Sequence, residues 1–392
     1  MNTFSFKLDA TDGTARAATM MTPHWKIETP IFMPVWTRSA IKGLTIDQIK
    51  DIGAEIMLVN NYHSYLRPGC DVVESFWGLH NFMNTDLPIL TDSWWFQVFS
   101  LWLGMTNDNW EKLAKVTEEG VHFRSYLDGS KHFFTPENVL DMQNALGADI
   151  IMAFDECAPG GSSKEYARAA MERTHRWAVR SKQQWQKNEI HRKAKGFYPQ
   201  ALFAIIQGVI YDDLRAESAK FISDLDTPWV AIGGLSVWES KEDMYRTLDV
   251  LEPLLPKEKP HYLMGVGTPE DLIEGIARGI DMMDCVLPTR IGRHGEVFTS
   301  FWNLKIWNEK YKYSQEKIPM APWFETSVSK KYSLGYLRHL INVGEATGWA
   351  LLSLHNIEYL LILAKKSREA ILSNQFTKLR ESFWSTYSTK KN

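Results

Sequence analysis

The stretch Asp149-Ile150-Ile151-Met152-Ala153-Phe154-Asp155 is an apolar run that ends on a carboxylate. A run of this length, without alternation, is typical of a strand that is buried on both faces. Two other runs end the same way, Ile89-Leu90-Thr91-Asp92 and Met282-Met283-Asp284. A carboxylate at the tip of a buried strand is costly unless a ligand or a partner uses it, so we expect the chemistry of the chain there.

The run at 149–155 is one of eight that are bounded by turn residues. The predicted strands are 31–35, 55–60, 89–93, 149–155, 201–208, 229–235, 261–266 and 282–288. Segments of helical period lie between them, at 136–147, 163–188, 211–224, 240–254 and 269–279. Buried strands that alternate with helices favour the α/β class, and eight of them favour a (β/α)8 TIM barrel over a doubly wound sheet.

Segments on either side complete the predicted architecture. The (β/α)8 catalytic barrel is expected to occupy residues 31–290. Residues 1–30 would precede it as an antiparallel β lid, and residues 291–392 would follow it as a C-terminal hairpin and helical subdomain. The predicted join is a loop and hairpin over 289–295, and the predicted C-terminal helices are 332–345, 356–373 and 375–386.

Composition narrows the class of protein. The chain has 392 residues, 44% of them hydrophobic, which is enough for one large core. No run approaches the roughly 18 to 20 apolar residues of a membrane span, so we expect a cytoplasmic protein that does not enter the membrane. Cys70, Cys157 and Cys285 form no CxxC pair, which argues against a disulfide framework. No glycine-rich nucleotide motif follows the first strand, so no nicotinamide or flavin cofactor is implied.

Charge is divided unevenly along the sequence. Residues 290–392 hold 16 Lys and Arg against 8 Asp and Glu, which leaves 28 against 39 in residues 1–289. The C-terminal excess fits a surface that faces a polyanion, and it fits a solvated, lysine-rich helical surface equally well.

Barrels of this kind place their active sites at the carboxyl ends of the strands. The polar residues at those ends are Asn60, Asp92, Asp155, Gln207, Gly233, Gly234, Gly265 and Asp284. Two carboxylates that face one pocket suit the exchange of a glycosidic bond, because one can attack the sugar carbon while the other moves protons. Aldolases and metal hydrolases use similar aspartates, so spacing alone does not select the reaction.

Ordered motifs surround these residues. They include Asn60-Asn61-Tyr62-His63, Leu90-Thr91-Asp92-Ser93, Met152-Ala153-Phe154-Asp155-Glu156-Cys157 and Ile232-Gly233-Gly234-Leu235. The longest is Gly279-Ile280-Asp281-Met282-Met283-Asp284-Cys285-Val286-Leu287-Pro288-Thr289-Arg290. In these motifs the chain closely resembles the bacterial tRNA-guanine transglycosylases, the queuine tRNA-ribosyltransferases, from about residue 27 to residue 385.

The resemblance implies an enzyme of queuosine biosynthesis that exchanges guanine at wobble position 34 of tRNA for a 7-deazaguanine, the prequeuosine base. Asp284 matches the nucleophile that forms a covalent intermediate with the ribose, and Asp92 matches the general acid and base. The residues that match the surroundings of the base are Asp92, Ser93, Trp94, Trp95, Phe96, Asp155, Gln207, Gly234, Leu235 and Met264.

RNA contacts and partners are implied in the same way. The residues that match RNA-binding segments are Gly265, Val266, Gly267, Thr268, Pro269, Glu270, Asp271, Thr289, Arg290, Ile291, Gly292 and Arg293. The expected partners are a tRNA with a G34 anticodon, a free 7-deazaguanine base and a second copy of the chain in a homodimer. Two alternatives stay open: a non-catalytic tRNA-binding paralogue or partner subunit with an obstructed site, and a sugar hydrolase that uses the paired aspartates.

The chain departs from the family at its structural zinc site. The family pattern is CxCxxC with a downstream histidine, whereas this chain carries Phe324, Thr326 and Ser329 and keeps only His355. A lone histidine with two hydroxyls does not supply the soft tetrahedral site that zinc prefers. We therefore predict no structural zinc, with apolar packing around Phe324 in its place.

The second departure concerns tryptophan. The family has glycine where this chain has Trp36, Trp77, Trp94, Trp95 and Trp238. An indole at a glycine position adds one of the largest side chains where the backbone needs positive φ or a close approach. One hypothesis is that the gene comes from an organism that reads UGA as glycine. The rival interpretation is genuine tryptophan and a closed, inactive site.

Overall fold

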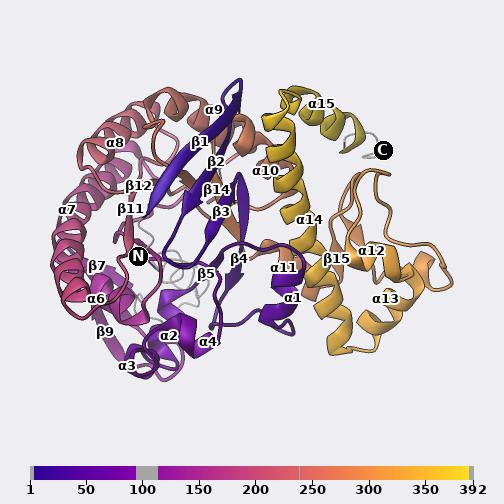
Figure 1. The fold of residues 1–392 in the computed structure, drawn as a ribbon, viewed down its shortest axis with the longest axis horizontal. Coiled ribbons are helices and arrows are strands. Elements are labelled where there is room, and N and C mark those ends of the chain that lie inside the picture. Colours follow the sequence, from indigo (N-terminus) through magenta and orange to yellow (C-terminus); the bar gives the residue numbers. More distant parts are fainter. Residues whose placement is uncertain (1–3, 94–113, 238, 388–392) are drawn as a thin grey trace.

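A closed barrel of eight parallel strands forms the centre of the computed structural model, which describes residues 4–93, 114–237 and 239–387 (Figure 1). The strand order is β10-β11-β12-β13-β14-β4-β5-β6, closed on itself. The strands are β4 (Ile31–Trp36), β5 (Met57–Val59), β6 (Ile89–Thr91), β10 (Ile150–Met152), β11 (Ala201–Ile206), β12 (Trp229–Ile232), β13 (His261–Leu263) and β14 (Met282–Cys285). All eight predicted strands and the TIM barrel are confirmed.

Helices cover the outside of the barrel, as in any (β/α)8 fold. Those predicted from sequence are α6 (Pro136–Leu146), α7 (Lys164–Ala194), α8 (Asp212–Asp224), α9 (Lys241–Leu251) and α10 (Pro269–Ala277). Four of them begin after a side chain that accepts a hydrogen bond from the first turn, namely Thr135, Ser163, Ser240 and Thr268. Shorter elements are α1 (Ile46–Asp51), α2 (Asn61–Leu66), α3 (Cys70–Ser75), α4 (Leu79–Met83) and the 3₁₀ turn Glu252–Leu254.

The N-terminal segment forms the predicted antiparallel sheet, β1 (Ser5–Asp12), β2 (Ala15–Met21) and β3 (Lys26–Thr29). This sheet covers the amino ends of the barrel strands. Phe4 packs edge-on against Trp229, the first residue of β12, with ring centroids 5.3 Å apart, and Arg16 pairs with Asp281 at 3.2 Å, just before β14. It therefore closes the end of the barrel opposite to the predicted site.

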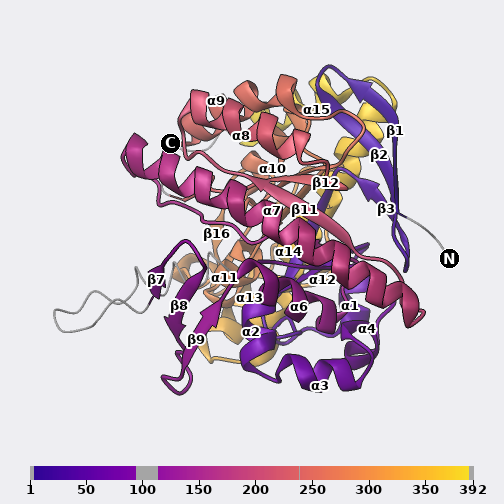
Figure 2. The same ribbon diagram turned by 90° about the vertical axis from the view of Figure 1, so that its left-hand side faces the viewer.

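A second antiparallel sheet is inserted between β6 and β10, and the sequence patterns did not predict it. It consists of β7 (Ala114–Val116), β8 (Val121–Arg124) and β9 (Lys131–Phe134). Figure 2 shows the two small sheets on opposite sides of the molecule. The turn after β8 reaches the carboxyl end of the barrel, because the Tyr126 hydroxyl hydrogen-bonds with Arg38 after β4 and with His63 after β5.

The C-terminal subdomain contains α12 (Ser327–Lys331), α13 (Leu334–Asn342), α14 (Ala346–Leu372), α15 (Phe376–Tyr387), the 3₁₀ turn Glu309–Tyr311 and the short hairpin β15 (Glu296–Val297) and β16 (Leu304–Lys305). Helix α14 packs along α10, strand β4 and α11 (Leu287–Arg293), the helix that follows β14 (Figure 1). None of the helices in the described ranges combines the length and apolar character needed to cross a bilayer.

Two predictions in this region are wrong. Residues 289–293 belong to a helix, α11 (Leu287–Arg293), instead of a loop, and this helix crosses the predicted domain boundary at 290. The predicted helix 356–373 begins earlier, at Ala346. Both helices contain a glycine, a residue that weakens a helix when no packing requires it. Gly292 and Gly348 instead allow close packing, since an added Cβ would lie 2.7 Å from the Ser353 nitrogen and 2.8 Å from the Leu340 Cβ.

Candidate active site

Three buried carboxylates lie at the carboxyl end of the barrel, as the sequence predicts. Asp92 follows β6, Asp155 follows β10, and Asp284 is the third residue of β14. Each is at least nine-tenths buried. The parallel strands bring together residues that are far apart in the sequence, which is the usual origin of a site in this fold.

Asp284 is bonded through one oxygen only. The Tyr262 hydroxyl donates to Oδ1 at 2.6 Å, and the backbone N–H of Gly265 donates to the same oxygen at 2.8 Å. Within the described residues no donor reaches Oδ2. Burial raises the pKa of Asp284, and these two hydrogen bonds oppose the rise. One oxygen is thus fixed while the other is available to a ligand.

Asp92 is held from the neighbouring strand β5. The Asn60 side-chain amide donates to its Oδ2 at 2.6 Å, and the backbone N–H of Asn61 donates to Oδ1 at 2.9 Å. Burial, the charge of Asp284 and the charge of Asp92 all raise the pKa of the Tyr262 hydroxyl. Both carboxylates therefore lie near one phenol, on the same side of the barrel interior.

Asp155 is the centre of a second group of contacts. The Ser93 hydroxyl donates to Oδ1 at 2.9 Å, and the Gln207 amide donates to Oδ2 at 2.7 Å. Burial raises the pKa of Asp155 to about 6, and the two neutral donors oppose this only in part. The other atom of the Gln207 amide, Oε1, is buried and accepts no hydrogen bond from the described residues. An unpaired buried oxygen beside a buried carboxylate is a site prepared for a donor from a ligand.

Other predicted base-binding residues surround these groups. An added Cβ at Gly233 would lie 2.7 Å from the Gln207 nitrogen, so glycine lets this segment approach the amide. Leu235 is buried after β12, and Met264 is half-buried after β13. Trp94, Trp95 and Phe96 lie outside the described residues.

The predicted RNA-binding residues fall into two segments. The first segment, 265–271, follows β13 and begins α10. Gly265 is exposed at φ +75°, and Thr268 caps the helix. Val266, Gly267 and Pro269 are buried. Glu270 and Asp271 both pair with Lys241, at 2.8 and 2.9 Å. They are engaged within the protein, so the exposed part of this segment is its glycine turn.

The second segment, 289–293, lies in α11 directly after the strand of Asp284. Thr289 and Gly292 are buried, and Ile291 is half-buried. Arg290 is exposed and forms no ion pair with any described residue. Burial and the nearby charge of Arg290 lower the pKa of Arg293. Two neighbouring guanidinium groups without a carboxylate partner can bind a phosphate.

Sequence reasoning missed two residues that hold the site. Tyr262 is not among the predicted site residues, yet it donates a hydrogen bond to Asp284 and lies close enough to Asp92 to feel its charge. Arg215 was not considered, although it is fully buried in α8 behind the Gln207 and Gly234 segments. An arginine in an amphipathic helix carries no signal of burial, so only the fold reveals this second residue.

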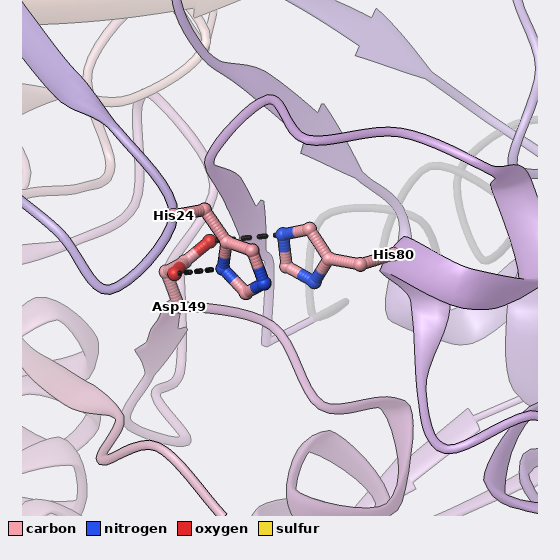
Figure 3. Close-up of side chains that lie close together, drawn as sticks. All are labelled: His24, His80 and Asp149. Atoms are coloured by element: carbon pink, nitrogen blue, oxygen red, sulfur yellow. Dashed lines mark hydrogen bonds and ion pairs between the residues drawn. The ribbon is translucent and has the colours of Figure 1, made fainter. Parts of the chain in front are cut away.

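A cluster that resembles a metal site lies at the opposite, amino end of the barrel (Figure 3). His24 Nδ1 lies 2.7 Å from Asp149 Oδ1, and His80 Nε2 lies 3.1 Å from Asp149 Oδ2. The two imidazole rings are stacked, with centroids 3.4 Å apart and planes within 11°. A ring nitrogen binds a metal in the plane of its ring, and one ion cannot lie in two parallel planes. The arrangement does not fit a metal site, and we treat it as a hydrogen-bonded cluster.

The four positions of the family zinc pattern meet in the C-terminal subdomain. Phe324 is buried and packs against Tyr359, with ring centroids 4.4 Å apart. His355 Nε2 donates to the Phe298 carbonyl at 2.8 Å, so Nδ1 accepts from the Thr326 hydroxyl at 2.7 Å. Burial lowers the pKa of His355 to about 4. Both ring nitrogens are occupied and no thiolate is present, so these residues do not fit a zinc ion.

Comparisons with known proteins agree with this geometry. The model of the family "Queuine tRNA-ribosyltransferase" matches residues 11–389. A queuine tRNA-ribosyltransferase of Herpetosiphon aurantiacus is 48% identical over 389 residues, which cover 99% of this chain and 94% of that protein. One of Ruminiclostridium cellulolyticum is 51% identical, with 96% of each chain covered, and one of Fusobacterium nucleatum is 47% identical, with 98% and 99% covered.

Proposed function

Because the chain belongs to the queuine tRNA-ribosyltransferase family, we propose that Asp284 and Asp92 exchange the guanine at position 34 of tRNA for a 7-deazaguanine, the prequeuosine base. The chain is a tRNA-guanine transglycosylase of queuosine biosynthesis and hence a pentosyltransferase. The observation that carries the residue assignment is the one-sided bonding of Asp284, which leaves Oδ2 available to attack a sugar carbon.

The first half of the exchange breaks the glycosidic bond. Asp284 Oδ2 attacks C1′ of the ribose, the bond from C1′ to N9 of guanine breaks, and Asp92 in its acid form supplies a proton to the departing base. The product is an ester between Asp284 and C1′ with the RNA strand intact. Tyr262 and the Gly265 N–H keep Oδ1 in place, so the carboxylate does not rotate as its charge is consumed.

The second half reverses the chemistry with a different base. Asp92, now a carboxylate, takes the N9 proton of the incoming 7-deazaguanine, and N9 attacks C1′ and releases Asp284. The Asn60 amide and the Asn61 backbone N–H hold Asp92 in place through both half-reactions.

Base recognition follows from the second group of contacts. A purine of the guanine type offers two adjacent N–H groups, and Asp155 can accept both once its own proton is lost. The unpaired Gln207 Oε1 supports a role for this amide in base binding, because it can accept a hydrogen bond from a donor of the base. Arg290 and Arg293 would bind the phosphates that flank nucleotide 34. We infer a homodimer as well, on the resemblance to the family alone.

A guanine exchange assay tests the proposal. The chain, incubated with tRNA and radiolabelled guanine, is expected to place label in the tRNA and, without free base, to form an adduct that survives denaturing electrophoresis. Asp284→Ala should abolish both label and adduct. Tight tRNA binding with neither label nor adduct in the unaltered chain would favour the non-catalytic subunit, and hydrolysis of simple glycosides without an effect on tRNA would favour the sugar hydrolase.

We also propose that the subdomain folds without zinc, because His355 and its partners are satisfied within the protein. A chelator is expected to leave the melting temperature unchanged, and metal analysis should find far less than one zinc per chain. The triple variant Phe324→Cys, Thr326→Cys, Ser329→Cys is the matched control, since it should gain zinc and become sensitive to the chelator. One zinc per unaltered chain would contradict the proposal.

A further inference from the structure

One buried arginine stands behind the segments that carry Gln207 and Gly234. Arg215 in α8 has no exposed surface, and it forms no ion pair with any described residue. Its guanidinium donates only to backbone carbonyls: Nε to Val209 at 2.7 Å, Nη1 to Ile206 at 3.1 Å and to Gly233 at 2.8 Å, and Nη2 to Gly234 at 3.1 Å. Burial lowers the pKa of Arg215 to about 10, and the nearby charge of Glu239 opposes this only in part. The four bonds to carbonyls therefore provide much of the compensation for the buried cation.

The segments that Arg215 holds are in strained conformations. Val209 lies at φ +52°, where a β-branched residue is a genuine outlier, and Gly234 lies at φ +66°. A left-handed conformation costs an L-residue about 1 to 2 kcal/mol, and it persists only when the surroundings determine it. Arg215 holds both turns at once, because its planar guanidinium donates to carbonyls that follow β11 and to carbonyls that follow β12.

The direction of these carbonyls fixes the direction of two N–H groups. In a trans peptide the C=O and the following N–H point to opposite sides. The Gly233 and Gly234 carbonyls point at Arg215, so the N–H groups of Gly234 and Leu235 point away from it. An added Cβ at Gly234 would overlap Oε1 of Gln207, and the Gly234 N–H faces the Cys157 thiol. The far side of these peptides is therefore the side of the Asp155 group.

We propose that Arg215 is a positioning residue for base selection. By holding the carbonyls, it presents the N–H groups of Gly234 and Leu235 to the O6 atom of the purine, beside the two N–H groups of the same edge that Asp155 accepts. This inference rests on the proposed function, because it names how the same pocket distinguishes an oxo purine from an amino purine. 2,6-Diaminopurine is the probe, since it carries an amino donor where guanine carries O6. It also lacks the proton on N1 that faces Asp155, but this difference is the same for the unaltered chain and for a variant at Arg215.

The test compares Arg215→Lys with a control at another buried arginine. Arg192 also donates to backbone carbonyls, of Tyr198 at 2.9 Å and Asn144 at 3.2 Å, but at the amino end of the barrel. The readout is calorimetric binding of the prequeuosine base and of 2,6-diaminopurine, with exchange kinetics in parallel. Arg215→Lys is expected to weaken binding of the prequeuosine base about tenfold or more and to lower its preference over 2,6-diaminopurine, with tRNA affinity unchanged within about twofold.

Arg192→Lys should lower the melting temperature but leave base affinity and base preference unchanged. Unchanged preference in Arg215→Lys, or an equal loss in Arg192→Lys, would overturn the inference. If Arg215→Lys does not melt cooperatively, Arg215→Ala is assayed with added guanidinium ion, which should restore the preference where ethylammonium does not; no recovery also overturns it. Absence of exchange in the unaltered chain counts against the proposed function alone, because base binding is measured without turnover.

Discussion

Strand β10 has a buried carboxylate at each end, and the two have opposite surroundings. Asp149, before the strand, contacts the imidazoles of His24 and His80 and accepts from the Ile89 N–H at 2.9 Å. Burial opposes its ionisation, but these partners outweigh burial and lower its pKa to about 2. Asp155, after the strand, has a hydroxyl and an amide as its side-chain donors among the described residues, and burial raises its pKa to about 6.

This difference in partners distinguishes carboxylates that stabilise the fold from carboxylates that can bind a ligand. Strand β14 repeats the pattern of partners, because Asp281 before it pairs with Arg16 at 3.2 Å, whereas Asp284 within it meets a phenol and one peptide N–H. The pKa values do not follow the same pattern, since burial outweighs Arg16 and raises the pKa of Asp281 to about 7. Asp149 and Asp281 each have a basic partner within the protein, so neither needs a substrate to find one. Neutral donors offset only part of the cost of burying the charged carboxylate. A ligand that brings further donors can therefore bind there favourably.

The largest expected effect is on β14. Asp284→Asn should lower guanine exchange at least about a thousandfold, because an amide cannot form the ester, and it should leave the melting temperature unchanged or higher. Asp281→Asn should do the opposite, with a lower melting temperature and exchange retained by the folded protein. Exchange assays and thermal melts on both variants check this. A folded but inactive Asp281→Asn would break the distinction between the two ends.

The next effect is on stability at the amino end of β10. Asp149→Asn should reduce the free energy of unfolding by about 3 kcal/mol at pH 7, because it removes the anion from a buried group of partners. The folded pKa of Asp149 is depressed, so its contribution is present above the unfolded pKa of about 3.9 and is lost as pH falls toward about 2. Urea denaturation from pH 7 to pH 3 measures the difference from the unaltered chain, which should shrink at the acid end.

The contrast between the two ends of the barrel strands shows which features can be predicted from the sequence. The eight strands are predictable because parallel strands buried on both faces must be apolar, and the positions of Asp92, Asp155 and Asp284 follow from them. Which carboxylate has a basic partner is not predictable, since His24, His80 and Asp149 belong to three separate segments that only the closed barrel joins. Helix α11 was missed for a similar reason: the role of Gly292 depends on α14, far along the chain.

A moderate effect is expected in the pH dependence of base binding. The ionised form of Asp155 accepts the two N–H groups of the base, and its pKa is about 6. The KM for free guanine should therefore be constant above about pH 7 and rise about tenfold per unit below pH 6. Asp155→Asn should have a high KM without this slope, and steady-state kinetics from pH 5 to pH 8 compare the two. A rise that persists in Asp155→Asn would assign the titration to another group.

The smallest expected effect on stability concerns two tryptophans, Trp36 near the carboxyl end of the barrel and Trp77 near its amino end. Trp36 ends β4 and is buried, and its Nε1 has no hydrogen-bond partner among the described residues. Trp77, between α3 and α4, lies at φ +66° and is 72% exposed. The left-handed region is strained for an indole-bearing residue and free of strain for glycine, as at the next residue, Gly78, with φ +109°.

Trp77→Gly should therefore raise the free energy of unfolding by about 1 kcal/mol, since relief of the left-handed strain exceeds the added entropy of the unfolded chain. Trp77→Asn is the control, because asparagine tolerates the same backbone and should give part of the gain. Urea denaturation measures both, and a loss in Trp77→Gly would mean that the indole packs usefully near Phe197. The intact mass of the protein from its own host decides whether UGA is read as glycine there, because each glycine in place of tryptophan lowers the mass. A lower mass at these positions would mean that the carboxyl end of the native barrel is more open, at Trp36, while its amino-end framework is unchanged.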